Sequence, residues 1–377
     1  MRQVTFAVLA SLVFALLGCG NDMPQNPDGD RFISVVVADT TGTIPGSTPG
    51  EPYFLEGAQV SLDSRTHQYQ AVTETDQNGV ATFENVVAGA YTVFTRAEHQ
   101  AVSHKVFTGF SDVFIESEIL VCDTILVSPI LASDLMINEI FYAGSDRSTF
   151  YFYDQYVELY NAADDTLYLD GLIVTRQTQI RWPDQEEVDF VRAIYAFQFP
   201  GTPITGRQHP IAPGQFVVIA ADAINHSLYC PKSIDLSNAD YECFNPLGHD
   251  YDNPRVPNLM SIHPTRTIDF LINLSHNAVV LATGEDFFYE DYVDDYGNVK
   301  INVAIPISTV IDGVEYASHT SVTKELTARV DAGFAGLGCT KYSGQSAERR
   351  ELGLDTNNST FDFLLAPHAT PWYSYFE

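Results

Sequence analysis

The residue types that most often bind metals or form cross-links gather between positions 226 and 253. His226, Cys230, Cys243 and His249 follow one another with 3, 12 and 5 residues between them, which is close to the two-cysteine, two-histidine set of a zinc site. The order His-Cys-Cys-His lacks a short Cys-x-x-Cys pair, and the cysteines of an exported protein favour disulfides. We therefore predict a Cys230–Cys243 disulfide, which would restrain this loop by about 3 kcal/mol. The sequence leaves the pairing of Cys122 and Cys339 open.

The loop that follows Cys243 carries oxygen donors for a hard cation. The stretch Gly248–Pro254 contains His249, Asp250 and Asp252, and its carboxylates and carbonyls could supply part of the roughly six to eight oxygens that Ca²⁺ takes. Asp, Asn, Gly and Pro are equally the ordinary residues of turns. We expect a turn, keep these three residues as candidate metal ligands, and expect no cofactor other than a bound cation.

A second stretch with chemical potential runs from Glu285 to Tyr296, where six carboxylates are interleaved with five aromatic residues. Aromatic rings stack on sugars or partner proteins, and carboxylates bind sugar hydroxyls, a basic partner or a cation. Runs of charge are also common on solvated faces, so a charged hairpin with its aromatics packed inward is the competing interpretation. The candidate binding residues are Asp286, Phe288, Tyr289, Glu290, Asp291, Tyr292, Asp294 and Asp295.

Another aromatic group, Phe150-Tyr151-Phe152-Tyr153 with Tyr156, precedes an apolar segment that begins at Val157. Large aromatic side chains are strongly buried on average. We therefore expect this group to pack in the core.

The sequence contains no pattern that brings catalytic groups together. It has no Gly-x-Ser-x-Gly, no His-Glu-x-x-His, no Gly-x-x-x-x-Gly-Lys and no Gly-x-Gly-x-x-Gly before a helix. Its 49 acidic residues form pairs by chance, so no glycosidase couple can be named. We expect a protein that is not an enzyme.

The charge and the first residues indicate where such a protein works. With 49 acidic against 19 basic residues the net charge is −30, which excludes a nucleic-acid binder that works by electrostatics. After Arg2, the apolar run from Val4 to Leu17 is typical of a signal peptide and too short to span a membrane as a helix. The sequence Leu16-Leu17-Gly18-Cys19 resembles the bacterial lipobox, which implies a lipid on Cys19.

Two regions of alternating apolar and polar residues follow a Pro-, Asn- and Gly-rich tether, and both indicate strands. In the first region the motif residues are Gly57/Val60, Thr75/Asp76/Gly79 and Gly89/Tyr91/Val93. These residues resemble the carboxypeptidase-regulatory, transthyretin-like or collagen-adhesin B-type module. The resemblance covers about 100 residues, to Pro129, and implies a rigid, non-catalytic β-sandwich.

The second region resembles the lamin-tail domain. The residues that carry this resemblance are Ile137-Asn138-Glu139-Ile140, Val157-Glu158-Leu159, Leu169-Asp170-Gly171, Pro213-Gly214, Arg349, Asp355-Thr356-Asn357-Asn358 and Asp362-Phe363. The resemblance implies an immunoglobulin-like β-sandwich in which the polar motif residues serve turns and strand caps. The region is longer than a compact domain of this kind, and the excess falls in Arg181–His209, Leu228–Arg266 and Glu285–Pro306. We expect these stretches to be long inserted loops, where binding function normally resides.

The whole combination resembles a lipoprotein family of unknown function whose members occur near TonB-dependent transporters. We predict an all-β fold of two β-sandwich domains in series, with a signal peptide over 1–18, a lipidated tether over 19–31, and domains over 32–131 and 132–377. We expect an outer-membrane lipoprotein, on the cell surface or the periplasmic face, that supports nutrient or metal uptake by binding a ligand or a transporter. The alternatives are a hydrolase or glycan-processing enzyme with its site in the inserted loops, and a surface adhesin or envelope scaffold.

Overall fold

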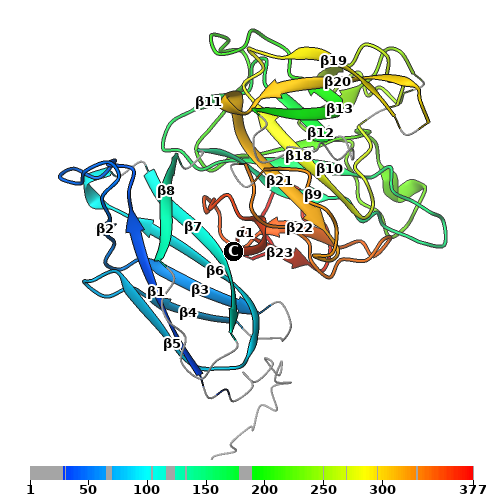
Figure 1. Ribbon diagram of the computed structural model, residues 1–377. Helices are drawn as coiled ribbons and strands as arrows, with labels where there is room; N and C mark the ends of the chain where they lie inside the picture. Colours follow the sequence, from blue (N-terminus) through cyan, green and yellow to red (C-terminus); the bar gives the residue numbers. More distant parts are fainter. Residues whose placement is uncertain are drawn as a thin grey trace, which may run out of the picture. The chain divides into compact units, whose positions relative to one another are not determined.

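The computed structural model of the chain describes residues 29, 31–64, 70–102, 105–115, 124–131, 134–177, 189–248, 250–268, 270–294, 296–327 and 330–376 (Figure 1). These residues form two compact units that divide between Ile130 and Leu131, one residue from the boundary expected from the sequence. The predicted signal peptide, Cys19 and Cys122 lie outside the described residues. In the part of the chain that is described, no helix has the length and apolar character needed to cross a membrane.

In its described residues, the first unit is a β-sandwich of eight strands around one hydrophobic core. Its strands are β1 (Arg31–Asp39), β2 (Tyr53–Phe54), β3 (Gln59–Ser64), β4 (Gln70–Glu74), β5 (Val80–Val86), β6 (Gly89–Glu98), β7 (Lys105–Ile115) and β8 (Thr124–Leu131). They follow the order β2-β1-β8-β7-β6-β3-β4, and β5 also pairs with β1. Alternate side chains of these strands point inward, and Val60, Leu62 and Val93 are fully buried.

The motif residues of the first unit act in turns and corners. Asp76 accepts hydrogen bonds from the backbone N–H groups of Asn78 (2.8 Å) and Val80 (3.0 Å) in the turn between β4 and β5. Gly79 in this turn has a φ of 72°, a left-handed conformation that glycine adopts without strain. The hydroxyl of Tyr91 donates to the carbonyl of Val87 at 2.7 Å. The motif therefore shapes the scaffold.

The second unit contains fifteen strands in the part of the chain that is described. They are β9 (Leu135–Phe141), β10 (Tyr156–Asn161), β11 (Leu167–Tyr168), β12 (Ile173–Gln177), β13 (Phe190–Gln198), β14 (Pro210–Ile211), β15 (Phe216–Ala220), β16 (Tyr241–Phe244), β17 (Asn258–Ser261), β18 (His276–Ala282), β19 (Phe288–Val293), β20 (Val299–Pro306), β21 (Val310–Ala317), β22 (Ser346–Arg349) and β23 (Phe363–Ala366). Short helical turns are η2 (His226–Leu228), η3 (Ile307–Thr309) and α1 (Ser359–Asp362).

Most of these strands belong to one long sheet that curls on itself. Its order is β21-β18-β12-β13-β17-β16-β15-β10-β9-β22-β23, and β20 joins β19 to β13. Val279 and Val314 near one end of this order share a core with Ile140 and Val157 near the other. The β9 residue Ile137 donates its N–H to Asp312 of β21 at 2.7 Å. The predicted all-β sandwich class is confirmed.

The three stretches that were expected to be long loops contribute strands to the sheet. Arg181–His209 contains β13, Leu228–Arg266 contains β16 and β17, and Glu285–Pro306 contains β19 and β20. In β13 the residues Val191, Ala193 and Tyr195 are buried, so this strand alternates like those of the predicted sandwich. The insertions therefore add strands to the sheet as well as residues to its loops.

Candidate functional site

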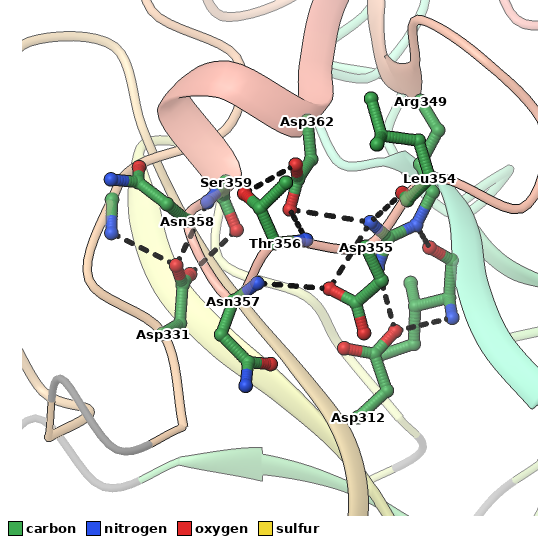
Figure 2. Close-up of polar contacts among 12 residues, drawn as sticks. Asp312, Asp331, Arg349, Leu354, Asp355, Thr356, Asn357, Asn358, Ser359 and Asp362 are labelled. Carbon is green, nitrogen blue, oxygen red and sulfur yellow. Dashed lines mark hydrogen bonds and ion pairs between the residues drawn. The ribbon is translucent and has the colours of Figure 1, made fainter. Parts of the chain in front are cut away.

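Arg349 lies at the centre of a buried ion network at the end of β22 (Figure 2). Its guanidinium binds the carboxylate of Asp312 at 2.9 Å and lies 3.5 Å from the carboxylates of both Asp355 and Asp362. Burial raises the pKa of Asp312 to about 6 and that of Asp362 to about 7, although Arg349 opposes this change. One cation thus faces three aspartates, and two of them hold protons more strongly than usual.

The N–H groups of Arg349 also donate hydrogen bonds to backbone carbonyls of the protein. The guanidinium donates to the carbonyls of Ile137 (2.8 Å) and Leu354 (2.7 Å), and it lies 4.8 Å from the centre of the Phe363 ring. Ile137 belongs to β9, Arg349 to β22 and Phe363 to β23, which are neighbours at one edge of the sheet. The network therefore joins these three strands to one another and to the turn before α1. We assign it a structural role.

Asp331 anchors the other side of that turn (Figure 2). Its carboxylate accepts hydrogen bonds from the N–H of Gly333 (2.9 Å) and from the N–H (2.9 Å) and hydroxyl (2.6 Å) of Ser359. Asn358 caps α1 by accepting the N–H of Thr360 at 3.1 Å. The residues from Asp355 to Asp362 that carry the lamin-tail resemblance are therefore used in turns and capping, as that resemblance implied.

A second group of buried acids lies beside a β-bulge in β9. Glu139 lies opposite Glu158 and Ile137 lies opposite Leu159, so Asn138 is an extra residue on β9. The Asn138 side chain donates to Glu158 at 3.0 Å. Glu348 of β22 also lies opposite Glu139. All three glutamates are fully buried.

The C-terminal segment, residues 367–376, binds these three glutamates through its backbone. The N–H groups of Thr370, Trp372 and Tyr375 donate to Glu139 (3.1 Å), Glu158 (2.5 Å) and Glu348 (2.8 Å), respectively. Burial raises the pKa of each of these carboxyl groups, that of Glu139 to about 7. Raised carboxyl pKa values are also found in acid–base catalytic sites. Here, however, the carboxylate oxygens of the three glutamates accept hydrogen bonds that hold the C-terminal segment in place.

Two neighbouring loops expose large apolar side chains to solvent. They are the loop before β10 and the turn around η2, and the exposed fractions are 63% for Phe150, 52% for Tyr153, 79% for Leu228 and 61% for Tyr229. We call these four residues the aromatic loop face. Tyr156 is buried as expected, but the prediction that the whole aromatic group packs in the core is wrong for Phe150 and Tyr153, because consecutive residues in a loop cannot all face inward.

Polar contacts tie the two loops together. Thr149 lies with its hydroxyl 3.9 Å from the Cys230 sulfur, and Lys232 forms an ion pair with Asp146 at 3.4 Å. Phe150 has a φ of 51°, a left-handed conformation that is strained for a bulky residue. Such strain persists only where the surroundings over-determine it, and it often marks ligand-binding loops.

The buried His226 and the half-buried Tyr151 support these loops. The His226 Nε2 lies 2.9 Å from the carbonyl of Asp222 and its Nδ1 lies 2.7 Å from the Tyr151 hydroxyl. A carbonyl only accepts, so Nε2 carries the proton and Nδ1 accepts from Tyr151. Burial lowers the pKa of His226, which keeps this tautomer neutral. Both ring nitrogens are occupied, so His226 positions the loop.

The predicted binding residues Phe288–Asp294 lie on β19 and in the turn that leads to β20, and Asp286 precedes β19. Glu290 forms an ion pair with Arg192 at 2.6 Å, and the Phe288 ring packs 5.0 Å from that of Phe190. Asp294 accepts the N–H of Asn298 at 2.8 Å within the turn. Tyr289, Asp291 and Tyr292 also lie on β19, whereas Asp295 lies outside the described residues.

The β19–β20 hairpin has features of both interpretations of this stretch, a binding surface and a charged hairpin with its aromatics packed inward. Its glutamate and aspartate contacts stabilise the hairpin, as expected for a charged solvated face. Its aromatics do not all pack inward, since Tyr289 is 51% and Tyr296 is 90% exposed.

The predicted Cys230–Cys243 disulfide is wrong. Cys230 is a free, buried thiol in the turn after η2, and Cys339 is also free. Cys243 lies on β16 and packs in the main core of the second unit. The tertiary structure therefore separates two cysteines that the loop-like sequence between them predicted to pair.

The described residues hold no cluster of three or more His, Cys, Asp or Glu arranged for a metal ion. Asp250 accepts the N–H of Asn245 at 2.5 Å, and Asp252 accepts from the side-chain amide of Asn258 at 2.8 Å. These contacts shape a turn, as the composition of the stretch suggested. His249, the third candidate ligand, lies outside the described residues.

The fold and these sites define an all-β protein whose buried acids are structural and whose exposed aromatic residues lie on loops. Residues 212–370 match the profile of a family that is described as a protein of unknown function, DUF4876. A crystal structure of a DUF4876 family protein from Bacteroides thetaiotaomicron is similar over 89% of this chain and 94% of that chain, with 24% identity and a TM-score of 0.55. This likeness shows a shared fold.

Two other solved structures cover part of the chain. The minor pilin GBS52 of Streptococcus agalactiae covers 50% of this chain and 82% of its own, with 14% identity and a TM-score of 0.19. A putative adhesin from Bacteroides ovatus covers 73% of this chain and 82% of its own, with 8% identity and a TM-score of 0.20. These TM-scores are too low to carry an argument. None of the curated proteins matches the chain.

Proposed function

We propose that this protein is a non-enzymatic binding protein of the bacterial cell envelope. In this proposal a lipid on Cys19 holds the chain at the outer membrane, and the second unit binds a ligand or an outer-membrane transporter and thereby supports nutrient or metal uptake. The lipobox-like sequence Leu16–Cys19 supports the anchor.

The aromatic loop face is the observation that carries the proposal. Its four side chains, Phe150, Tyr153, Leu228 and Tyr229, are all more than half exposed. The free energy that burial of this apolar surface would release is gained only when a partner covers it. Aromatic residues are also enriched at the centres of protein and ligand interfaces. The hydrogen bond between His226 and Tyr151 holds the loops before any partner arrives, so little conformational entropy is lost on binding.

The buried acids favour binding over catalysis. Arg349 and its aspartates, and the three glutamates under the C-terminal segment, are all occupied by backbone and side-chain groups of the protein. A general acid or base must reach a substrate atom within hydrogen-bond distance. These groups instead hold strands and segments together.

Co-purification with a matched variant tests the proposal. We expect the full-length protein, isolated from native membranes after mild cross-linking, to carry an envelope protein or a ligand. The triple variant Phe150→Ala, Tyr153→Ala, Tyr229→Ala should lose that partner while it remains folded. The control is Tyr296→Ala, which removes the most exposed ring of the β19–β20 hairpin and should retain the partner. Isolation of the protein alone, or equal capture by the triple variant and the wild type, would overturn the proposal.

A further inference from the structure

The strand β19 forms an open edge of the large sheet in the second unit. In the described part of the chain, β19 pairs only with β20, which in turn pairs with β13 (Figure 1). An edge strand presents a row of backbone N–H and C=O groups to which a further strand can form hydrogen bonds. The outer side of β19 is therefore available to a partner in an extended conformation.

The pairing of β20 with β13 shows which residues of β19 direct their backbone groups outward. Antiparallel strands alternate between residue pairs that exchange hydrogen bonds and pairs that do not. The N–H of Ile307 donates to the carbonyl of Asp189 at 2.9 Å, so the odd-numbered residues of β20 bond to β13 and the even-numbered ones bond to β19. The β19 residues opposite odd-numbered residues are Tyr289, Asp291 and Val293. Their backbone groups therefore point to the outer side of β19.

The side chains of these three residues lie on one face of the hairpin, because alternate residues of a strand share a face. Tyr289 is 51% and Val293 is 66% exposed, and Val299, which lies opposite Val293 on β20, is 68% exposed. Asp291 lies between the two apolar residues of β19 and is also exposed. The open edge thus combines backbone donors and acceptors with the exposed pattern apolar, acidic, apolar.

Asp291 gives this edge a negative charge without a cationic partner among the described residues. The neighbouring carboxylates differ in this respect, since Glu290 lies 2.6 Å from Arg192 and Asp294 lies 4.0 Å from Lys300. A strand that adds to the edge places one of its side chains directly opposite Asp291. A basic side chain in that position stabilises the pair of strands, whereas an acidic one destabilises it.

A second copy of the chain does not suit this edge. The two antiparallel registers that overlap β19 with itself most fully, with outward groups paired, place Asp291 opposite Asp291 or Glu290 opposite Glu290. Like charges directly opposite one another are destabilising, and each copy has a net charge of −30. The acidic residues therefore select against self-pairing and for a basic segment.

We propose that the outer edge of β19 binds an extended segment of a partner protein in which a Lys or Arg lies between two apolar residues at alternate positions. The backbone of the segment bonds to the N–H and C=O groups of Tyr289, Asp291 and Val293. Its basic side chain lies opposite Asp291, and its apolar side chains lie opposite Tyr289 and Val293. In strand addition of this kind, main-chain hydrogen bonds give affinity and alternate side chains give specificity.

This surface shares no residue with the aromatic loop face, and its binding is measured directly with peptides. The inference therefore goes beyond the proposed function and does not rest on it.

Binding of capped synthetic peptides to the full-length protein tests the edge. We expect saturable binding of Thr-Tyr-Thr-Lys-Thr-Val-Thr, measured by fluorescence anisotropy of the labelled peptide, and about fivefold weaker binding when Glu replaces its Lys. A methyl group on the backbone nitrogen of the peptide lysine removes a donor to the edge and should weaken binding about tenfold. Hydrogen exchange should slow at the amides of Tyr289, Asp291 and Val293 when the peptide is bound.

Charge reversal separates the edge from the net charge of the protein. Asp291→Lys should reverse the preference, so that the glutamate peptide binds more tightly than the lysine peptide. Asp164→Lys makes the same change of charge at an exposed position between β10 and β11 and should keep the wild-type preference.

Three results would overturn the proposal: no saturable binding of the lysine peptide, equal binding of the methylated peptide, or an unchanged preference in Asp291→Lys. A dimer of the wild-type protein in sedimentation experiments, with the same three amides protected, would also overturn it, because a second copy would then occupy the edge.

Discussion

Arg349 shows how a single residue can hold the second unit together. Its side chain is 1% exposed and faces three aspartates, so its removal would leave carboxylates buried without a counter-charge. Breaking a buried ion network by removing one partner is far more costly than losing an exposed pair.

We expect Arg349→Met to lower the free energy of unfolding by about 3–5 kcal/mol. Urea denaturation of the full-length protein measures this change. Arg192→Met, which removes the partly exposed partner of Glu290, is the matched control and should cost less than about 1 kcal/mol. Equal losses in the two variants would contradict the role assigned to the network.

Glu139 makes stability depend on pH in a defined direction. Burial raises its pKa from 4.5 to about 7, so between these pH values the folded protein binds more protons than the unfolded chain. The free energy of unfolding must therefore fall as the pH rises through this window. In Glu139→Gln, which stays uncharged, we expect this fall to be shallower by about 1–3 kcal/mol. Denaturation curves across the window measure it, with the exposed Glu351→Gln as the control that should follow the wild type.

At the scale of elements, the C-terminal segment acts as a strap across β9, β10 and β22. It forms no strand of the sheet, yet its N–H groups reach one glutamate on each of these three strands. A carboxylate buried without such donors loses stability, so the segment and the glutamates depend on each other.

Ending the chain at His368 should therefore destabilise the second unit by about 1–3 kcal/mol for each glutamate that loses its donor. Ending the chain at Ser374 removes only the Tyr375 N–H that donates to Glu348, so the loss of stability should be smaller than in the chain that ends at His368. Thermal unfolding of the two truncated chains gives the comparison. A loss that is the same for both would place the effect in the last residues instead of the strap.

The loop before β10 combines strain with exposure at Phe150. Its φ of 51° suits glycine, and its ring is 63% exposed. We expect Phe150→Gly to raise stability by up to about 1 kcal/mol, because it relieves the left-handed strain, and to weaken partner binding because it removes the ring. Phe150→Ala should weaken binding without the gain in stability. A loss of stability in Phe150→Gly would show that the ring packs more than its exposure indicates.

At the scale of the whole molecule, the net charge limits which ligands and partners the protein can bind. A net charge of −30 repels other anions, so an anionic ligand would bind only where local cations offset that repulsion. In the proposed function, a lipid on Cys19 would hold the protein near a membrane surface, where its partners are found.

Replacing the predicted lipidated cysteine tests the anchor. We expect Cys19→Ala to move the protein from the membrane fraction to the soluble envelope fraction, since an unmodified chain lacks the buried acyl groups that hold it. Metabolic labelling with a fatty acid should mark the wild type and leave the variant unlabelled. Cys230→Ala, which removes a buried thiol, is the control and should remain in the membrane fraction.

The sequence by itself determined the local structure of this protein. Alternation of apolar residues predicted the strands that contain Val60 and Val157, and Asp76 and Gly79 predicted a turn, because side-chain period and turn chemistry are properties of neighbouring residues. The all-β class followed from these local signals, and the motif around Arg349, Asp355 and Asp362 was visible in the chain.

Only the tertiary structure decided which distant residues meet. Asp312 joins Arg349 across the sheet, Cys230 is separated in packing from Cys243, and the expected loops became strands of the sheet. Local patterns do not specify these outcomes, because a strand's partner and the covering of its outer face depend on how the whole sheet curls. For the same reason, the exposure of Phe150 could be seen only in the folded chain.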